Sequence, residues 1–103
     1  MLEREVEKAV VDYAEAKGCI SIKLDGMHNR GKPDRLFFYS GRTLVIEFKA
    51  PAKTPTKLQQ DWLRKFREAG FDAECIDNIG RGKTKVDRFM KTAKADAEMF
   101  DDL

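Results

Sequence analysis

The sequence predicts an α/β domain whose elements follow the order αβββαβα. Apolar residues recur at helical spacing in three segments, and short apolar or β-branched runs bounded by glycine or proline lie between them. The length of 103 residues, with 42% hydrophobic and 37% charged residues, is typical of one globular domain. We therefore expect a single domain over 1–103, with its core in 2–95 and an acidic tail at 96–103.

The first half of the chain begins with a helix and a strand. Residues 2–17 form an amphipathic pattern that ends at Gly18, which suits a helix followed by a C-terminal glycine. Residues 19–24 form a short apolar run typical of a strand, and a glycine-bearing basic loop is expected over 26–32. The apolar stripe of the helix contains Leu2, Val6, Val10, Tyr13 and Ala14.

A β-hairpin is expected next, from the runs 36–39 and 43–46 joined by Ser40-Gly41. With a two-residue loop Tyr39 faces Arg42, and Asp34 then faces Glu47. Facing β-carbons lie roughly 5 Å apart, where like charges repel, so a divalent cation between the two acids would explain them. A three-residue loop with a bulge would instead turn one acid to the other face.

Lys49 follows Glu47 by two residues, so it projects from the same face at roughly 6.6 Å along the strand. Pro51 ends that strand, and Thr54-Pro55 or Thr56 opens a second helix that Gly70 ends. Its apolar positions are Leu58, Trp62, Leu63 and Phe66. A fourth strand over 73–77, a loop at 80–82 and a last helix follow, and the apolar positions of that helix are Val86, Phe89, Met90, Ala93 and Ala97.

Charge and composition exclude several classes of protein. Residues 1–95 carry 20 basic and 14 acidic side chains, which favours a polyanionic partner, although a solvated mixed surface explains the same count. No apolar run reaches the roughly 20 residues of a membrane span, and the N-terminus lacks a signal-peptide pattern. Two cysteines and one histidine cannot build a structural zinc site, so an intracellular protein without a membrane partner is expected.

The order and spacing of these residues resemble a known family. Gly31-x-Pro33-Asp34 followed by Glu47-x-Lys49 is similar to the PD-(D/E)xK nuclease superfamily, and more narrowly to its VRR-NUC (virus-type replication-repair nuclease) domain. The narrower resemblance covers 2–90 and includes Glu3, Lys32 to Arg35, Val45 to Lys49, and Gln59-x-x-Trp62-Leu63 with Gly70. It implies a restriction-endonuclease-like fold with a small mixed sheet flanked by helices, in a stand-alone cytoplasmic enzyme of phage or bacterial type.

The resemblance implies a metal-dependent endonuclease acting on branched DNA such as four-way (Holliday) junctions, in DNA repair. From the residues, Asp34, Glu47 and the Phe48 carbonyl suit Mg²⁺, for which Mn²⁺ can substitute. Lys49 is expected to help electrostatically rather than as a general base. By the resemblance Gln59 faces the site. Basic residues nearby are expected to contact DNA, namely His28, Arg30, Lys32, Arg35 and Lys53.

The helix carboxylate of the site is expected to be Glu3, as a second-metal or outer ligand. At 100° per residue Glu3 lies about 60° from the centre of the apolar stripe, whereas Glu5 and Glu7 lie about 100° away. Glu7 is the alternative.

Simpler interpretations stay open for several residues. Asp34 and Glu47 are alternatively surface residues paired with basic side chains, Gln59 completes a capping box with Thr56, and Trp62 belongs to the core. Gly82-Lys83-Thr84 resembles the end of a phosphate-binding loop, but Asp77 stands where that motif needs glycine, so no nucleotide cofactor is expected.

Alternatives for the whole chain are a catalytically silent DNA-binding module and a small interaction protein that meets an acidic partner. For the enzyme we expect a symmetric homodimer, because one acid pair cuts one strand and a four-way junction has two-fold symmetry. The last helix, with Val86, Phe89, Met90 and Ala93, is the expected contact.

Overall fold

The computed structural model of the protein describes residues 1–24 and 30–101. Its elements follow the predicted order, which confirms the αβββαβα architecture. They are α1 (Glu3–Ala16), β1 (Ile20–Lys23), β2 (Arg35–Tyr39), β3 (Arg42–Phe48), α2 (Lys57–Glu68), β4 (Asp72–Ile76) and α3 (Ile79–Asp101). Glycine ends the first two helices as expected, since Gly18 and Gly70 have φ values of 106° and 94°.

The four strands form one mixed sheet in the order β1-β2-β3-β4. The first three strands pair antiparallel, and β4 runs parallel to β3. Tyr39 faces Arg42, and the turn residues Ser40 and Gly41 have φ values of 48° and 78°. Two successive positive φ angles are typical of a two-residue hairpin loop. The predicted register is therefore confirmed, and the three-residue loop is excluded.

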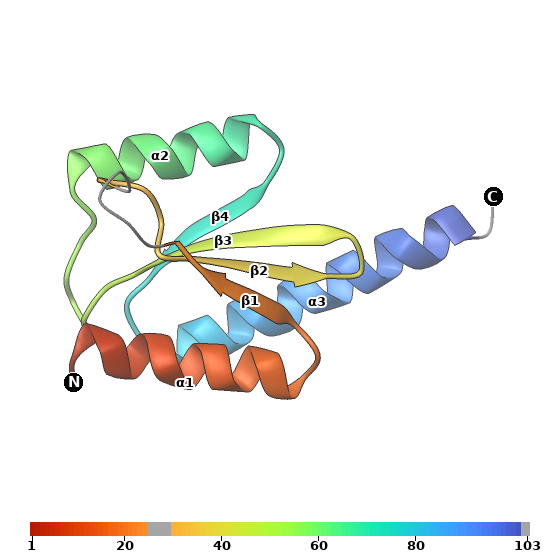
Figure 1. Cartoon of the computed structure of the whole chain (residues 1–103), viewed down its shortest axis with the longest axis horizontal. Helices are drawn as coiled ribbons and strands as arrows, with labels where there is room; N and C mark the ends of the chain where they lie inside the picture. Colours follow the sequence, from red (N-terminus) through yellow and green to blue (C-terminus); the bar gives the residue numbers. More distant parts are fainter. Residues whose placement is uncertain (25–29, 102–103) are drawn as a thin grey trace.

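Helices cover both faces of the sheet (Figure 1). The larger core cluster joins α1 and α3 to residues of β2, β3 and β4, among them Phe37, Ile46 and Phe48. The smaller cluster joins Leu63 of α2 to Val45 and Ala73 on the opposite face. Strand β3 is thus buried from both sides, and its C-terminal end lies between α1 and α2, where the acidic residues of the candidate site are found.

Helix α3 begins earlier than the sequence predicts, because Gly80-Arg81-Gly82 is helical rather than a loop. The Asn78 side chain accepts a hydrogen bond from the Arg81 backbone N–H at 2.7 Å, which is the contact of an N-cap. A β-carbon at Gly82 would collide with Val10 of α1. This glycine therefore permits close helix packing, and it does not interrupt the helix.

The same helix does not supply the predicted dimer contact. Val86, Phe89, Met90 and Ala93 are all buried in the core of the chain itself, between 0% and 9% exposed. They face the sheet and α1, so they are not available to a second copy. The helix also continues through most of the predicted tail, where Asp96 pairs with Arg42 at 2.6 Å.

Two further observations concern the cysteines and the hydropathy of the helices. Cys19 is buried, Cys75 is half-buried, and both are free thiols whose pKa burial raises. In residues 1–24 and 30–101, no helix combines the length and the hydropathy that crossing a bilayer requires.

Candidate active site

The hairpin brings Asp34 and Glu47 together. Asp34 directly precedes β2, and its backbone N–H donates to the Ile46 carbonyl at 3.1 Å. Its carboxylate oxygen Oδ2 accepts a hydrogen bond from the Phe48 backbone N–H at 2.7 Å. These two contacts hold Asp34 across from the end of β3. The strand pairing ends at Arg35 facing Ile46, so the direct facing of Asp34 and Glu47 stays a prediction, although the charge of Asp34 acts on Glu47.

Glu47 is buried, with 2% of its surface exposed. Its Oε1 atom accepts a hydrogen bond from the Gln59 side-chain amide at 3.1 Å and lies 3.6 Å from the Lys49 ammonium. Its Oε2 atom is buried and has no hydrogen-bond partner. Burial, followed by the charge of Asp34, raises the pKa of Glu47 to about 8, against the opposing effect of Lys49. The interpretation of Glu47 as a surface residue is therefore wrong.

Asp34 has a related but milder environment. Burial raises its pKa, whereas the hydrogen bond from the Phe48 N–H lowers it, and the charges of Glu7 and Glu3 raise it further. The charge of Asp34 thus disfavours the ionised form of Glu47, and burial disfavours the ionised form of both acids. A cation between them would relieve both.

Helix α1 presents its carboxylates differently from the prediction. Glu7 is the buried one, at 9% exposure, and its Oε2 atom accepts a hydrogen bond from Arg35 Nε at 2.8 Å. Glu3 is exposed, yet its charge acts on both Asp34 and Glu47. The prediction from helix angles that Glu7 points away from the interior was wrong. The long Glu7 side chain reaches inward to Arg35 of β2, a partner that the pattern of the helix alone does not reveal.

Gln59 fulfils both of the roles that the sequence left open. Its backbone N–H donates to the Thr56 hydroxyl at 3.2 Å, and its side-chain oxygen accepts from the Thr56 N–H at 2.9 Å, which completes a capping box. The amide nitrogen of the same side chain donates to Glu47. The cap therefore orients the amide that holds the catalytic candidate.

The oxygen donors at this point fit a hard divalent cation. Asp34 and Glu47 supply carboxylates, and the Glu47 oxygen that lacks a partner is what a bound cation would satisfy. Among the residues that the structure describes, no three Asp, Glu, His or Cys side chains form one metal-binding group. The acid pair with the Phe48 carbonyl therefore stays the predicted donor set, and a ligand role for Glu3 also stays a prediction.

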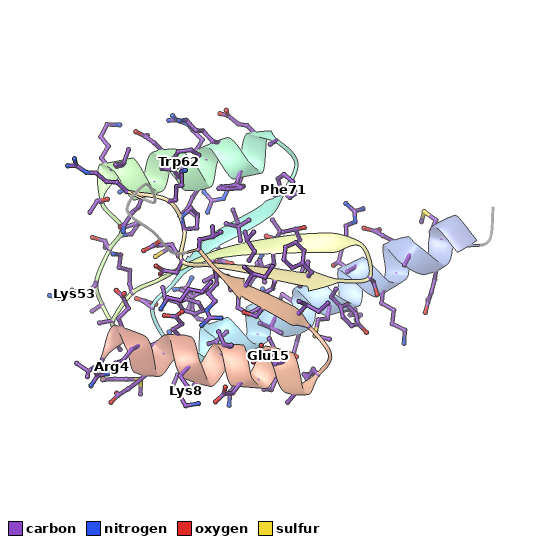
Figure 2. All side chains as sticks on the ribbon, in the orientation of Figure 1. Arg4, Lys8, Glu15, Lys53, Trp62 and Phe71 are labelled. Atoms are coloured by element: carbon purple, nitrogen blue, oxygen red, sulfur yellow. The ribbon has the colours of Figure 1, made fainter. Side chains whose placement is uncertain are left out.

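The predicted DNA-binding residues differ in their exposure and in their contacts. Arg30 and Lys53 are exposed, and Lys53 lies in the linker between β3 and α2 (Figure 2). Lys32 lies over the Trp62 ring, with its nitrogen 5.3 Å from the centroid. Arg35 is bound to Glu7 and donates to the Ser21 hydroxyl at 3.1 Å, so a DNA contact would have to share it. His28 lies outside the described residues.

Comparison with known proteins supports this fold. No family model and no curated protein sequence matches the chain. A solved structure described as a "VRR_NUC domain protein" is similar with a TM-score of 0.76 at 16% identity, over 88% of this chain and 89% of that one. A second, a "VRR_NUC domain", has a TM-score of 0.69 at 24% identity, over 86% and 94%. The protein has the fold of VRR-NUC domains, as the motif resemblance implied.

Proposed function

We propose that this protein is a metal-dependent endonuclease that hydrolyses phosphodiester bonds in DNA, with Mg²⁺ as its cofactor and Mn²⁺ as a substitute. The observation that carries the proposal is the buried Glu47 beside the half-buried Asp34, with one Glu47 oxygen lacking a partner. A repelling acid pair destabilises the fold, and a cation at this place explains why the chain has one. The VRR_NUC-like fold supports the same function.

Each residue near the pair has a role in this mechanism. A bound metal ion would supply polarisation of the phosphate and a lowered pKa for the attacking water. Asp34, Glu47 and the Phe48 carbonyl would hold the ion, and Gln59 fixes the orientation of Glu47. The Lys49 ammonium, beside the same carboxylate, stabilises negative charge that develops on the phosphate.

The finer part of the proposal concerns the substrate, which we propose to be branched DNA, including four-way junctions. One chain has one acid pair and cuts one strand at a time, so paired cuts in a two-fold junction need two copies related by symmetry. Because α3 is excluded as the contact, the apolar surface left for a second copy includes edge strand β1, where Ile20 is 66% and Ile22 48% exposed.

Cleavage of linear, flap and four-way DNA with Mg²⁺, with Mn²⁺ and with EDTA tests the enzyme. We expect metal-dependent products, with paired cuts on the junction. Calorimetric titration of Mg²⁺ into the protein without DNA tests the metal site independently, and light scattering at micromolar concentration tests the dimer. A strict monomer without paired cuts would leave a nicking nuclease.

The same assays separate the alternatives. A silent DNA-binding module would bind DNA with strong salt dependence and cleave none of it. A protein that meets an acidic partner would show neither activity. The acid pair argues against both, because neither binding function requires two repelling carboxylates.

A further inference from the structure

Helix α2 has an aromatic surface that the catalytic proposal does not use. Trp62, the one tryptophan of the chain, is half-buried, so it is not the core residue that the simpler interpretation expected. Of the four apolar positions predicted for this helix, Leu63 is buried, whereas Leu58 is 42% exposed. The aromatic ring of Trp62 thus remains partly accessible at the surface of α2.

Two lysines approach this ring. The Lys65 nitrogen lies 4.5 Å from the centroid of Trp62, and the Lys32 nitrogen lies 5.3 Å from it. Both distances are within the range of cation–π contacts. They come from different elements, because Lys65 belongs to α2 and Lys32 to the segment before β2.

A depression of about 200 Å³ lies beside the ring. Aromatic and apolar side chains line it together with Lys65, and Phe71 in it is 43% exposed. Trp62 and Phe71 mark its place along α2 and the turn that follows (Figure 2). An apolar floor with a cationic rim suits a ligand that has both a flat ring and a phosphate.

The surface is joined to the acid pair at two points. Gln59, which holds Glu47, precedes Trp62 by three residues, so the two side chains lie on one face of α2 about one turn apart. Lys32 precedes Asp34 by two residues in the chain. A strand whose phosphate reaches Asp34 and Glu47 can therefore extend to Trp62.

We propose that Trp62 is a stacking platform for an unpaired base of the nucleic acid beside the cut, with Lys32 and Lys65 contacting the neighbouring phosphates. The inference rests on the proposed function, which makes DNA the substrate. Stacking on an aromatic side chain flanked by lysines is a sequence-tolerant way of holding single strands. It makes unpaired nucleotides, and not an intact duplex, the form that the site recognises.

Intrinsic fluorescence tests the platform directly, since Trp62 is the single tryptophan of the chain. A short oligothymidylate is titrated into the wild-type protein in EDTA, where no cleavage occurs. We expect saturable quenching, and little quenching by a blunt duplex of equal length. Absence of quenching by the single strand overturns the platform, even where Mg²⁺-dependent cleavage is observed.

Variants separate stacking from general apolar contact. Trp62→Leu should weaken the affinity for labelled oligothymidylate, measured by anisotropy, roughly 5- to 150-fold, while Trp62→Phe retains most of it. Phe71→Leu, in the same depression without a lysine at its ring, should have little effect. Equal losses for Trp62→Leu and Phe71→Leu would overturn the proposal in favour of an apolar partner. Melting temperatures confirm that each variant is folded.

The lysines are tested through salt dependence. Lys32→Ala and Lys65→Ala should each lower the slope of log affinity against log salt by about 0.7, as expected for one phosphate contact on a single strand. An unchanged slope in both variants contradicts their role. If the wild-type protein shows quenching by the single strand but no Mg²⁺-dependent cleavage, the proposed nuclease is contradicted and the stacking platform is retained.

Discussion

Glu7 and Glu47, the two buried acids among the residues that the structure describes, lie on opposite sides of the hairpin and have different charged neighbours. Glu7 has a cation of its own, since Arg35 binds it at 2.8 Å and Lys23 lies 3.9 Å away. Glu47 has only the Lys49 ammonium at 3.6 Å, lies near the charge of Asp34, and has one oxygen without a partner. Removal of a buried carboxylate from a bonded cation leaves that cation unpaired, whereas a buried carboxylate whose charge is not compensated marks a place where a further cation can bind.

The comparison also explains why the chain can support both acids. The ion pair of Glu7 and Arg35 connects α1 to β2, and Arg35 directly follows Asp34 in the chain. The acid pair is therefore set on elements that other contacts already fix. Glu7 contributes to stability and Glu47 opposes it, and substitutions should distinguish these two roles.

The largest expected effect is the loss of cleavage when either member of the pair Asp34 and Glu47 is removed. Asp34→Ala and Glu47→Ala should each lower the cleavage rate by at least about 100-fold, because each removes a metal ligand. Binding of Mg²⁺ measured by calorimetry should be lost in both. Asp34→Asn, which keeps an oxygen for the Phe48 N–H, controls for loss of that contact. Full activity in any of these variants would contradict the metal site.

The next effect concerns the amide that holds Glu47. Gln59→Ala should lower the cleavage rate about 10- to 100-fold, the range expected when a supporting hydrogen bond to a ligand is removed. Thr56→Ala is the matched control, because it removes the cap of α2 and leaves the Gln59 amide present. If the two variants lose activity equally, Gln59 acts through the helix cap alone.

The third effect concerns the free energy of unfolding, to which Glu7 is expected to contribute. Glu7→Ala removes the partner of a half-buried guanidinium, and we expect it to lower the free energy of unfolding by about 1–3 kcal/mol. For a domain of this size that corresponds to a drop in melting temperature of roughly 5–15 °C. Glu15→Ala, at an exposed position of the same helix, should change little. An unchanged melting temperature in Glu7→Ala would remove the contrast with Glu47.

How far the sequence predicts this arrangement depends on how local each signal is. The hairpin register follows from Ser40-Gly41 and from the strand pattern around it, so the pairing from Arg35 to Arg42 was predicted correctly. The capping box at Thr56 is equally local. By contrast, the partner of Glu7 comes from a strand 28 residues away, which helix periodicity cannot identify.

The same limit applies to α3 and to Trp62. Gly80 and Gly82 are typical of a loop in isolation, and they are helical because α1 packs closely against Gly82. The burial of Val86 and Phe89 in the core follows from that packing too. The spacing of Trp62 and Lys65 by three residues was a signal for their contact, whereas the approach of Lys32 needed the fold.

The pH dependence of stability sharpens the contrast without any activity assay. The pKa of Glu47 is about 8 in the folded metal-free protein and near 4.5 when exposed. Between these values the folded state retains a proton that the unfolded state has lost, so stability falls as pH rises from about 4.5 to about 8. The slope from this group is at most about 1.4 kcal/mol per pH unit.

Glu47→Gln has no proton to lose and should not show that decline. Its melting temperature relative to wild type should therefore increase from pH 5 to pH 8 in EDTA and stay level above that. Saturating Mg²⁺ should reduce the difference by stabilising the wild type. Parallel melting curves for the two proteins across this range would mean that Glu47 is not protonated in the folded state.

The smallest expected effect concerns the charges of α1. Glu3 is exposed, but its charge acts on Asp34 and Glu47, so Glu3→Gln should raise the Mg²⁺ concentration needed for half-maximal cleavage by about tenfold or less. Glu5→Gln is the matched control, because glutamine can also accept the Leu2 N–H that Glu5 accepts at 3.0 Å. Glu7→Gln should fall between them, since an amide can still accept from Arg35 while the charge near Asp34 is lost. The rate at saturating Mg²⁺ should change little in all three, because the charge attracts the cation and does not touch the phosphate. Equal, small shifts at all three positions would mean that α1 contributes packing alone.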